Sequence, residues 1–320
     1  MKYFARRIVH TALLLLAISF LCFALVQISP SDYFDAMRLN PRISSQTIDH
    51  IRTAYGMDRP LVVRYGRWLH STFQGEMGIS LAYNVPVWPL LRVRAQNTLL
   101  LTGTSTFLAW LIAIPLGIWS AEKRGTHGDR LVGLATSAIL AVPDLLVYLA
   151  LLLLAVRTGW FPTGGMESLG SAGMSTWGRM GDTVRHLVLP AMGLAVVALP
   201  VLLRHVRSAM VDALESPFVC AARGHGIPRR RLIYRYALPA AVNPLVTLVG
   251  LSVAAMLSTS LLAEVILSWP GMGPLLLEAI FSRDVYIVTG AVMLSSMFLM
   301  AGNLLADFLI FVNDPRIRVE

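Results

Sequence analysis

Long apolar segments dominate this sequence, and they restrict its fold more than any other feature. Of the 320 residues, 56% are hydrophobic and only 14% are charged. Backbone groups inside a lipid bilayer must bond to one another, so an apolar segment of about 20 residues crosses the bilayer as a helix. The sequence therefore predicts an all-α polytopic membrane protein with six transmembrane helices.

These apolar segments divide the chain into four parts. A cytoplasmic tip and a first transmembrane helix are expected over 1–29, and an extracytoplasmic loop over 30–93. The main membrane domain is expected over 94–312 and a cytoplasmic tail over 313–320. The other five helices are expected near 98–120, 131–156, 187–203, 240–265 and 286–312. A signal peptide is the alternative for the first segment, but its apolar run is long and no cleavage site follows.

The distribution of basic residues predicts how the helices are oriented. The segments expected in the cytoplasm carry 15 Lys and Arg in 61 residues, whereas those expected outside carry 12 in 118. Basic residues concentrate in cytoplasmic loops. Both termini are therefore expected in the cytoplasm. The net charge of +9 is interpreted as contact with anionic lipid headgroups rather than with nucleic acid.

No motif of an ATPase, a hydrolase or a metalloenzyme is present. A phosphate-binding loop requires Gly-Lys-Ser/Thr, and neither Lys2 nor Lys123, the two lysines, follows a glycine. The sequence also lacks His-Glu-x-x-His and Gly-x-Ser-x-Gly. We predict that the chain is not an enzyme and binds no metal or cofactor. Any ATP and Mg²⁺ would be used by another subunit.

A few polar features lie within or beside the apolar segments. Ionisable groups in membrane helices are costly and often functional, so Pro143, Asp144 and Glu264 are candidates for a translocation path. Alternatively, Asp144 satisfies backbone groups freed by the proline, and Glu264 is an interfacial cap or an ion-pair partner. A second candidate is an outer turn or gate, with a tryptophan anchored at headgroup depth and a glycine in positive φ. Its residues are Trp269, Pro270, Gly271 and Gly273.

The polar loop 204–239 carries seven arginines and the signals of a short helix. Ser216 is expected at the N-cap, followed by Pro217 at the first helical position. Gly224 and Gly226 are expected to end the helix in left-handed conformations. A solvated cytoplasmic loop explains the arginines, but not a helix that presents apolar side chains. Such a helix requires a groove, either in its own protein or in a partner, for Phe218, Val219 and Ala222.

This helix and several other motifs resemble one family. Phe218-Val-Cys-Ala-Ala-Arg-Gly-His-Gly-Ile227 is similar to the coupling-helix region of ABC importer inner-membrane permeases. Further segments resemble the permeases for dipeptides, oligopeptides and nickel; they are 55–61, 74–80, 115–121, 186–190, 268–273, 278–284 and 314–318. In order along the chain, they extend the resemblance over nearly its whole length.

The resemblance implies a type I ABC importer permease fold with a cytoplasmic coupling helix. The chain would translocate a small solute, a di- or oligopeptide or a nickel or metal chelate, across the bacterial inner membrane by alternating access. Its partners would be a second homologous permease, two ABC ATPases, an extracytoplasmic solute-binding protein and membrane lipids. The implied ATPase-coupling residues are Glu215, Ser216, Phe218, Val219, Ala221, Ala222, Arg223, Gly224 and Gly226. The alternative is a stand-alone secondary transporter or channel, which would need more ion ligands in the membrane than Asp144.

Overall fold

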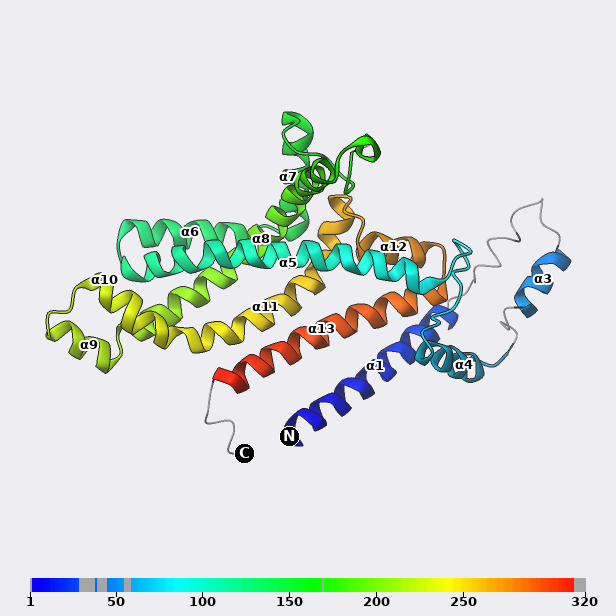
Figure 1. Ribbon diagram of the computed structural model, residues 1–320, viewed down its shortest axis with the longest axis horizontal. Helices are drawn as coiled ribbons and strands as arrows, with labels where there is room; N and C mark the ends of the chain where they lie inside the picture. The colour runs from blue at the N-terminus through cyan, green and yellow to red at the C-terminus, as the bar shows by residue number, and fades with distance from the viewer. Residues whose placement is uncertain (1, 29–37, 39–44, 55–58, 169, 314–320) are drawn as a thin grey trace. The chain divides into compact units, whose positions relative to one another are not determined.

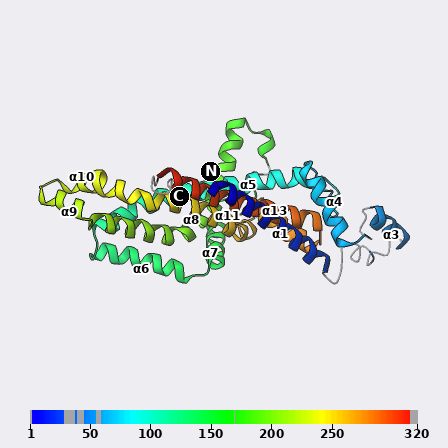
Figure 2. The ribbon, with the colours of Figure 1, turned by 90° about the horizontal axis from the view of Figure 1, so that it is seen from below.

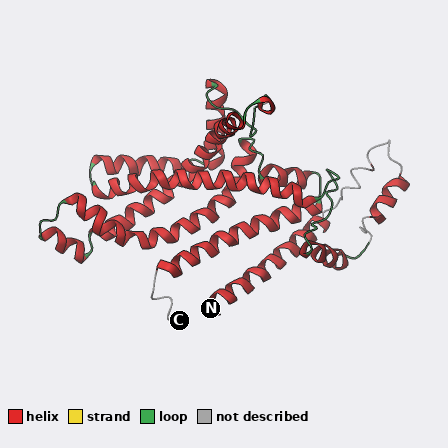
Figure 3. Ribbon diagram, in the orientation of Figure 1, coloured by secondary structure: helices red, strands yellow, loops and turns green. Residues whose placement is uncertain are grey.

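The computed structural model describes residues 2–28, 38, 45–54, 59–168 and 170–313. These residues are almost entirely helical, with one isolated β-bridge between Ile79 and Pro86 (Figure 3). Five described helices are long and apolar enough to cross a membrane, and a bent helix pair makes a sixth if it counts as one span. The predicted all-α polytopic membrane fold is therefore confirmed. Of the predicted tail, only Asn313 lies within the described residues.

The chain separates into two compact units. The first combines Met1–Thr98 with Pro270–Phe298, and the second combines Leu99–Trp269 with Leu299–Glu320. Two long helices, α5 (Val87–Glu122) and α13 (Val285–Asn313), contribute residues to both units.

In the first unit, an aromatic cluster packs the first helix on a short amphipathic one. This unit contains α1 (Lys2–Ile28), α3 (Ser45–Ala54), α4 (Leu61–Phe73) and α12 (Met272–Phe281). Phe23 of α1 and Trp68 of α4 are buried together with Val285. The Trp68 indole Nε1 donates a hydrogen bond to the Met77 carbonyl oxygen at 3.1 Å, so its polar edge is satisfied.

The second unit is a bundle in which α8 and α11 pack along each other (Figures 1 and 2). Its elements are α6 (His127–Ala141), α7 (Asp144–Thr158), η1 (Ser171–Gly173), α8 (Thr176–Leu214), α9 (Pro217–Gly224), α10 (Arg229–Arg231), the π segment η2 (Leu232–Ala237) and α11 (Leu238–Ile266). The core of this bundle reaches from the membrane helices to α9, because Leu202, Met210 and Val219 belong to one buried cluster.

Several helices are longer than their apolar segments indicate. Helix α8 has 39 residues, although the apolar segment was expected to cover only 187–203. Its N-cap, Ser175, accepts a hydrogen bond from the Gly178 N–H at 3.2 Å, well before the apolar segment begins. Hydropathy marks only the part of a helix that lies in hydrocarbon, whereas backbone hydrogen bonding continues beyond it.

The segment expected to be one helix over 131–156 consists of two. Helix α6 ends at Ala141, α7 begins at Asp144, and their axes are bent by 98°. Pro143 has no N–H to continue the helical ladder, and it restricts Val142 before it to an extended conformation. The proline therefore breaks this span.

Small residues bring α11 into close contact with the C-terminal half of α13. A methyl group added at Gly250 would lie 2.4 Å from the Cα of Ala306. A second contact lies four residues later in α11 and four residues earlier in α13. There, a methyl group added at Gly302 would lie 3.1 Å from the Ala254 Cβ. Small residues spaced four apart allow membrane helices to approach backbone to backbone. The pairs Gly250/Ala306 and Gly302/Ala254 form such a contact.

Candidate functional site

Helix α9 lies beside α10 at one end of the second unit (Figures 1 and 2). Pro217 occupies the first turn, as predicted. Ser216 stands at the N-cap, but the predicted side-chain cap is wrong, because its hydroxyl donates to the Ala213 carbonyl oxygen at the end of α8. Gly224 is helical, so its predicted left-handed conformation is wrong as well. Gly226, with φ +76°, alone turns the chain after α9.

The two faces of α9 have different surroundings. Val219 is fully buried in the core of the second unit, and Ala222 packs against the same cluster. On the other face Phe218 is 51% exposed, and Ala221 is also exposed. The protein itself therefore holds one face of the helix, and Phe218 is the large apolar side chain left on the other.

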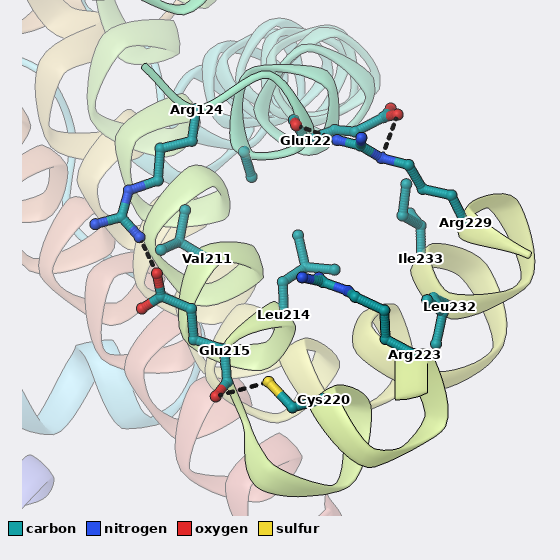
Figure 4. A pocket seen from close by; sticks show the side chains of 11 residues that line it. Glu122, Arg124, Val211, Leu214, Glu215, Cys220, Arg223, Arg229, Leu232 and Ile233 are labelled. Atoms are coloured by element: carbon teal, nitrogen blue, oxygen red, sulfur yellow. Dashed lines mark hydrogen bonds and ion pairs between the residues drawn. The ribbon is translucent and has the colours of Figure 1, made fainter. Parts of the chain in front are cut away.

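Two ion pairs hold the chain on either side of α9 (Figure 4). The Arg124 guanidinium contacts the Glu215 carboxylate just before the helix. After the helix, the Arg229 Nε lies 3.1 Å from the Glu122 Oε1. Exposed ion pairs contribute about 0–1 kcal/mol each, so these pairs position the loop more than they stabilise it. Sequence reasoning missed both, because pairing across about 100 residues leaves no local signal.

A cavity of about 370 Å³ lies between α9 and these ion pairs. Its wall includes Leu214, Cys220, Leu232 and Ile233, and Arg223 extends into the space between the two pairs (Figure 4). Among the residues that the structure describes, Arg223 forms no ion pair of its own.

The candidate path residues are separated. Asp144 lies at the start of α7, after Pro143, and lines a cavity of about 360 Å³. The other polar residues of this cavity are His205, Ser252 and Thr259, and most of its wall is apolar side chains of α8 and α11. Glu264 is fully buried in α11 and does not line this cavity. His205 was missed by the sequence analysis, because a single histidine in a basic loop carries no pattern.

The outer turn differs from its prediction in two respects. Trp269 is fully buried among side chains such as Tyr148 and Leu187, so it is a core residue of the second unit and not an interfacial anchor. The predicted positive φ is not at Gly271, whose φ is −98°, but at Ser268, whose φ is 52°. The left-handed residue ends α11 before the turn begins, so the glycine can take an extended conformation.

After this turn, Pro270, Gly271 and Gly273 belong to the first unit, where two hydrogen bonds fix the chain. The Asn97 amide donates to the Pro270 carbonyl oxygen at 2.8 Å, and the Met272 N–H donates to the Thr98 hydroxyl at 2.9 Å. Gly273 is buried at the start of α12. These contacts hold the beginning of α12 on the N-terminal half of α5 and indicate a fixed turn.

Elsewhere in the first unit, two carboxylates hold the polar hairpin that precedes α5. Asp284 accepts hydrogen bonds from the Ser80 hydroxyl at 2.6 Å and the Ala82 N–H at 3.0 Å. The Tyr83 hydroxyl donates to Glu278, and this carboxylate raises the pKa of Tyr83 to about 12. The tyrosine therefore keeps its proton at neutral pH and continues to donate. Within the described residues, no three His, Cys, Asp or Glu side chains gather as they would around a metal ion.

Known proteins similar to this chain cover its whole length. Residues 113–319 match the model of the binding-protein-dependent transport system inner membrane component, and residues 1–102 match the N-terminal component of the same system. The oligopeptide transport system permease protein AppB of Bacillus subtilis is 34% identical over 318 residues, which are 99% of each chain. The dipeptide transport system permease protein DppB of Escherichia coli K12 is 32% identical over 335 residues, again 99% of each.

A solved structure supports the fold. The chain resembles a chain of the MetNI methionine ABC transporter in an inward-facing conformation, with a TM-score of 0.52 and 19% sequence identity. The match covers 72% of this chain and 95% of that one. The type I importer fold expected from the sequence is therefore present.

Proposed function

This chain belongs to the family of binding-protein-dependent transport system inner membrane components, and from that membership we propose that it carries di- or oligopeptides across the bacterial inner membrane. It is the permease subunit of an ABC importer, a non-catalytic membrane protein. Relatives named as oligopeptide and dipeptide permeases, 31–34% identical over their full length, support the peptide as solute. Nickel is the alternative solute within the family.

The proposed importer works by alternating access. Two ABC ATPases bind ATP and Mg²⁺, a second homologous permease completes the membrane part, and an extracytoplasmic protein delivers the solute. Both termini and α9 lie in the cytoplasm, where the ATPases contact the exposed face of α9. The observation that carries this proposal is the difference between the two faces of α9. Val219 is buried in the bundle of the same chain, whereas Phe218 is exposed. Closure of the ATPases displaces α9 and thereby tilts the membrane helices.

The path of the solute is proposed to pass along the cavity that contains Asp144. This cavity lies between α8 and α11, next to the break between α6 and α7, and its wall is mostly apolar. An apolar wall with few polar groups suits a solute that must not be held tightly. The carboxylate of Asp144 would attract the α-ammonium group of a peptide.

Uptake by a deletion strain tests this function. Deleting the gene is expected to abolish uptake of radiolabelled tri-alanine, and the wild-type chain is expected to restore it. Uptake of radiolabelled Ni²⁺ by the same strain should not change. Loss of nickel uptake with normal tri-alanine uptake would contradict the peptide assignment.

The same strain tests the path. Asp144→Asn retains the shape of the side chain and removes its charge, so tri-alanine uptake at limiting concentration is expected to fall about tenfold, as one lost charge contact would cause. The matched control is Asp212→Asn, a charge removal on α8 outside this cavity. Equal uptake by the two variants would remove Asp144 from the path.

A further inference from the structure

The carboxylate of Asp129 receives four hydrogen bonds from three parts of the second unit. The Arg207 Nε donates to its Oδ1 at 2.7 Å and the Arg207 Nη2 to its Oδ2 at 2.8 Å, which is a two-pronged contact. The Ser120 hydroxyl adds a bond of 2.6 Å and the Gly125 N–H one of 3.0 Å. The Asp129 side chain is only 8% exposed. This carboxylate therefore joins the end of α5, the α5–α6 turn and α8.

Close packing surrounds this carboxylate on both sides. A methyl group added at Gly117 of α5 would lie 2.7 Å from the Cβ of Val206, the residue before Arg207. A methyl group at Gly128 would lie 2.5 Å from the ring of Trp119. No space for a methyl group remains at either contact, so around this carboxylate α5 packs directly on α8 and α6 packs directly on α5.

The α5–α6 turn also contacts both ends of the segment that contains α9. Arg124 in the turn pairs with Glu215 before α9, and Glu122 at the end of α5 pairs with Arg229 after it. The same short segment thus holds the flanks of α9 through exposed ion pairs and holds α8 through Asp129. A displacement of α9 has a second route into the bundle, besides its covalent connections to α8 and α10.

We propose that the α5–α6 turn transmits the movement of α9 to α5 and α6, with Asp129 and Arg207 as its positioning residues. This proposal rests on the function proposed above. When the ATPases move α9, Arg124 and Glu122 follow its flanks. The Asp129–Arg207 contact then keeps the position of the turn fixed relative to α8. Without this contact, α8 and α11 would respond to ATP while α5 and α6 would lag behind.

The first test is Arg207→Gln in the complete importer, with its ATPases and binding protein, reconstituted in vesicles. Glutamine keeps a polar side chain but removes the charge and the two-pronged contact. We expect an assembled complex whose ATP hydrolysis stays within about twofold of wild type, while tri-alanine uptake per ATP falls about fivefold. Arg204→Gln, an exposed arginine on the same helix, is the control and should change neither. Unchanged uptake per ATP in Arg207→Gln would overturn the proposal.

A second test avoids the partly buried contact, in case Arg207→Gln does not assemble. Arg124→Glu and Glu215→Arg each place like charges at an exposed ion pair, so each should lower uptake per ATP about threefold. The double exchange restores opposite charges and should restore uptake, which a purely local loss of structure would not do. No recovery in the double variant would contradict the proposal. If the wild-type chain did not assemble with ATPase subunits at all, that result would instead contradict the proposed function.

Discussion

Phe218→Glu is expected to reduce tri-alanine uptake more than tenfold without lowering the amount of chain in the membrane. Phe218 is half exposed on α9, so its replacement leaves the bundle intact. Burying a phenylalanine in a partner's groove contributes about 1.5–3 kcal/mol. An unpaired carboxylate in the same groove would cost about as much again, and about 1.4 kcal/mol already corresponds to a factor of ten in affinity. The ATPases should therefore no longer purify with the variant.

Phe73→Glu is the matched control for this variant. Phe73 ends α4 in the first unit and is 80% exposed, so the same substitution occurs on another phenylalanine far from α9 in the sequence. Its complex should retain the ATPases. If Phe218→Glu retains them equally and imports tri-alanine normally, the exposed face of α9 is not the ATPase contact.

Gly250→Leu is expected to prevent the chain from accumulating in the membrane in folded form. A side chain at this position would begin 2.4 Å from the Ala306 backbone, and backbone atoms cannot move aside by changing rotamer. Helices α11 and α13 would have to separate along the contact that also includes Gly302 and Ala254. Overpacking usually costs about 1–3 kcal/mol, and a backbone overlap lies at or above the upper end of that range. The folded fraction can be measured by size-exclusion chromatography of the detergent-solubilised chain.

Gly103→Leu provides the comparison for this prediction. Gly103 lies on the exposed side of α5, and a methyl group added there would meet no atom within 4 Å. This variant should elute as wild type does, because leucine is also the better helix former. Equal folded yields for Gly250→Leu and Gly103→Leu would show that α11 and α13 do not pack as described.

Hydropathy was sufficient to predict the helical fold. It did not divide the span expected over 131–156 into two helices at Pro143, and it did not predict the ends of α8, because that helix continues beyond its apolar segment. The burial of Trp269 was not predicted either. Composition places a tryptophan beside a Pro-Gly turn at a membrane interface, but its burial depends on contacts with Tyr148 and Leu187, far away in sequence.

The candidate site was predicted in part. The position of α9 followed from Pro217 and from the glycine at 226, since both act through local backbone geometry. Which face of α9 the bundle covers did not follow, because Phe218 and Val219 are adjacent apolar residues and only tertiary packing distinguishes them. The contact of Asp129 with Arg207 was missed for the same reason, since it joins two helices distant in sequence.

Cys220 allows a direct measurement of whether α9 contacts the ATPases in the cytoplasm. The chain has two cysteines, and Cys22→Ser leaves the exposed Cys220 of α9 as the single thiol. A membrane-permeant maleimide carrying a photoreactive group should link Cys220 to an ATPase subunit after illumination, and an impermeant maleimide should not label intact cells. Labelling of Cys220 from outside the cell, or a photoproduct without any ATPase subunit, would show that α9 does not contact the ATPases in the cytoplasm.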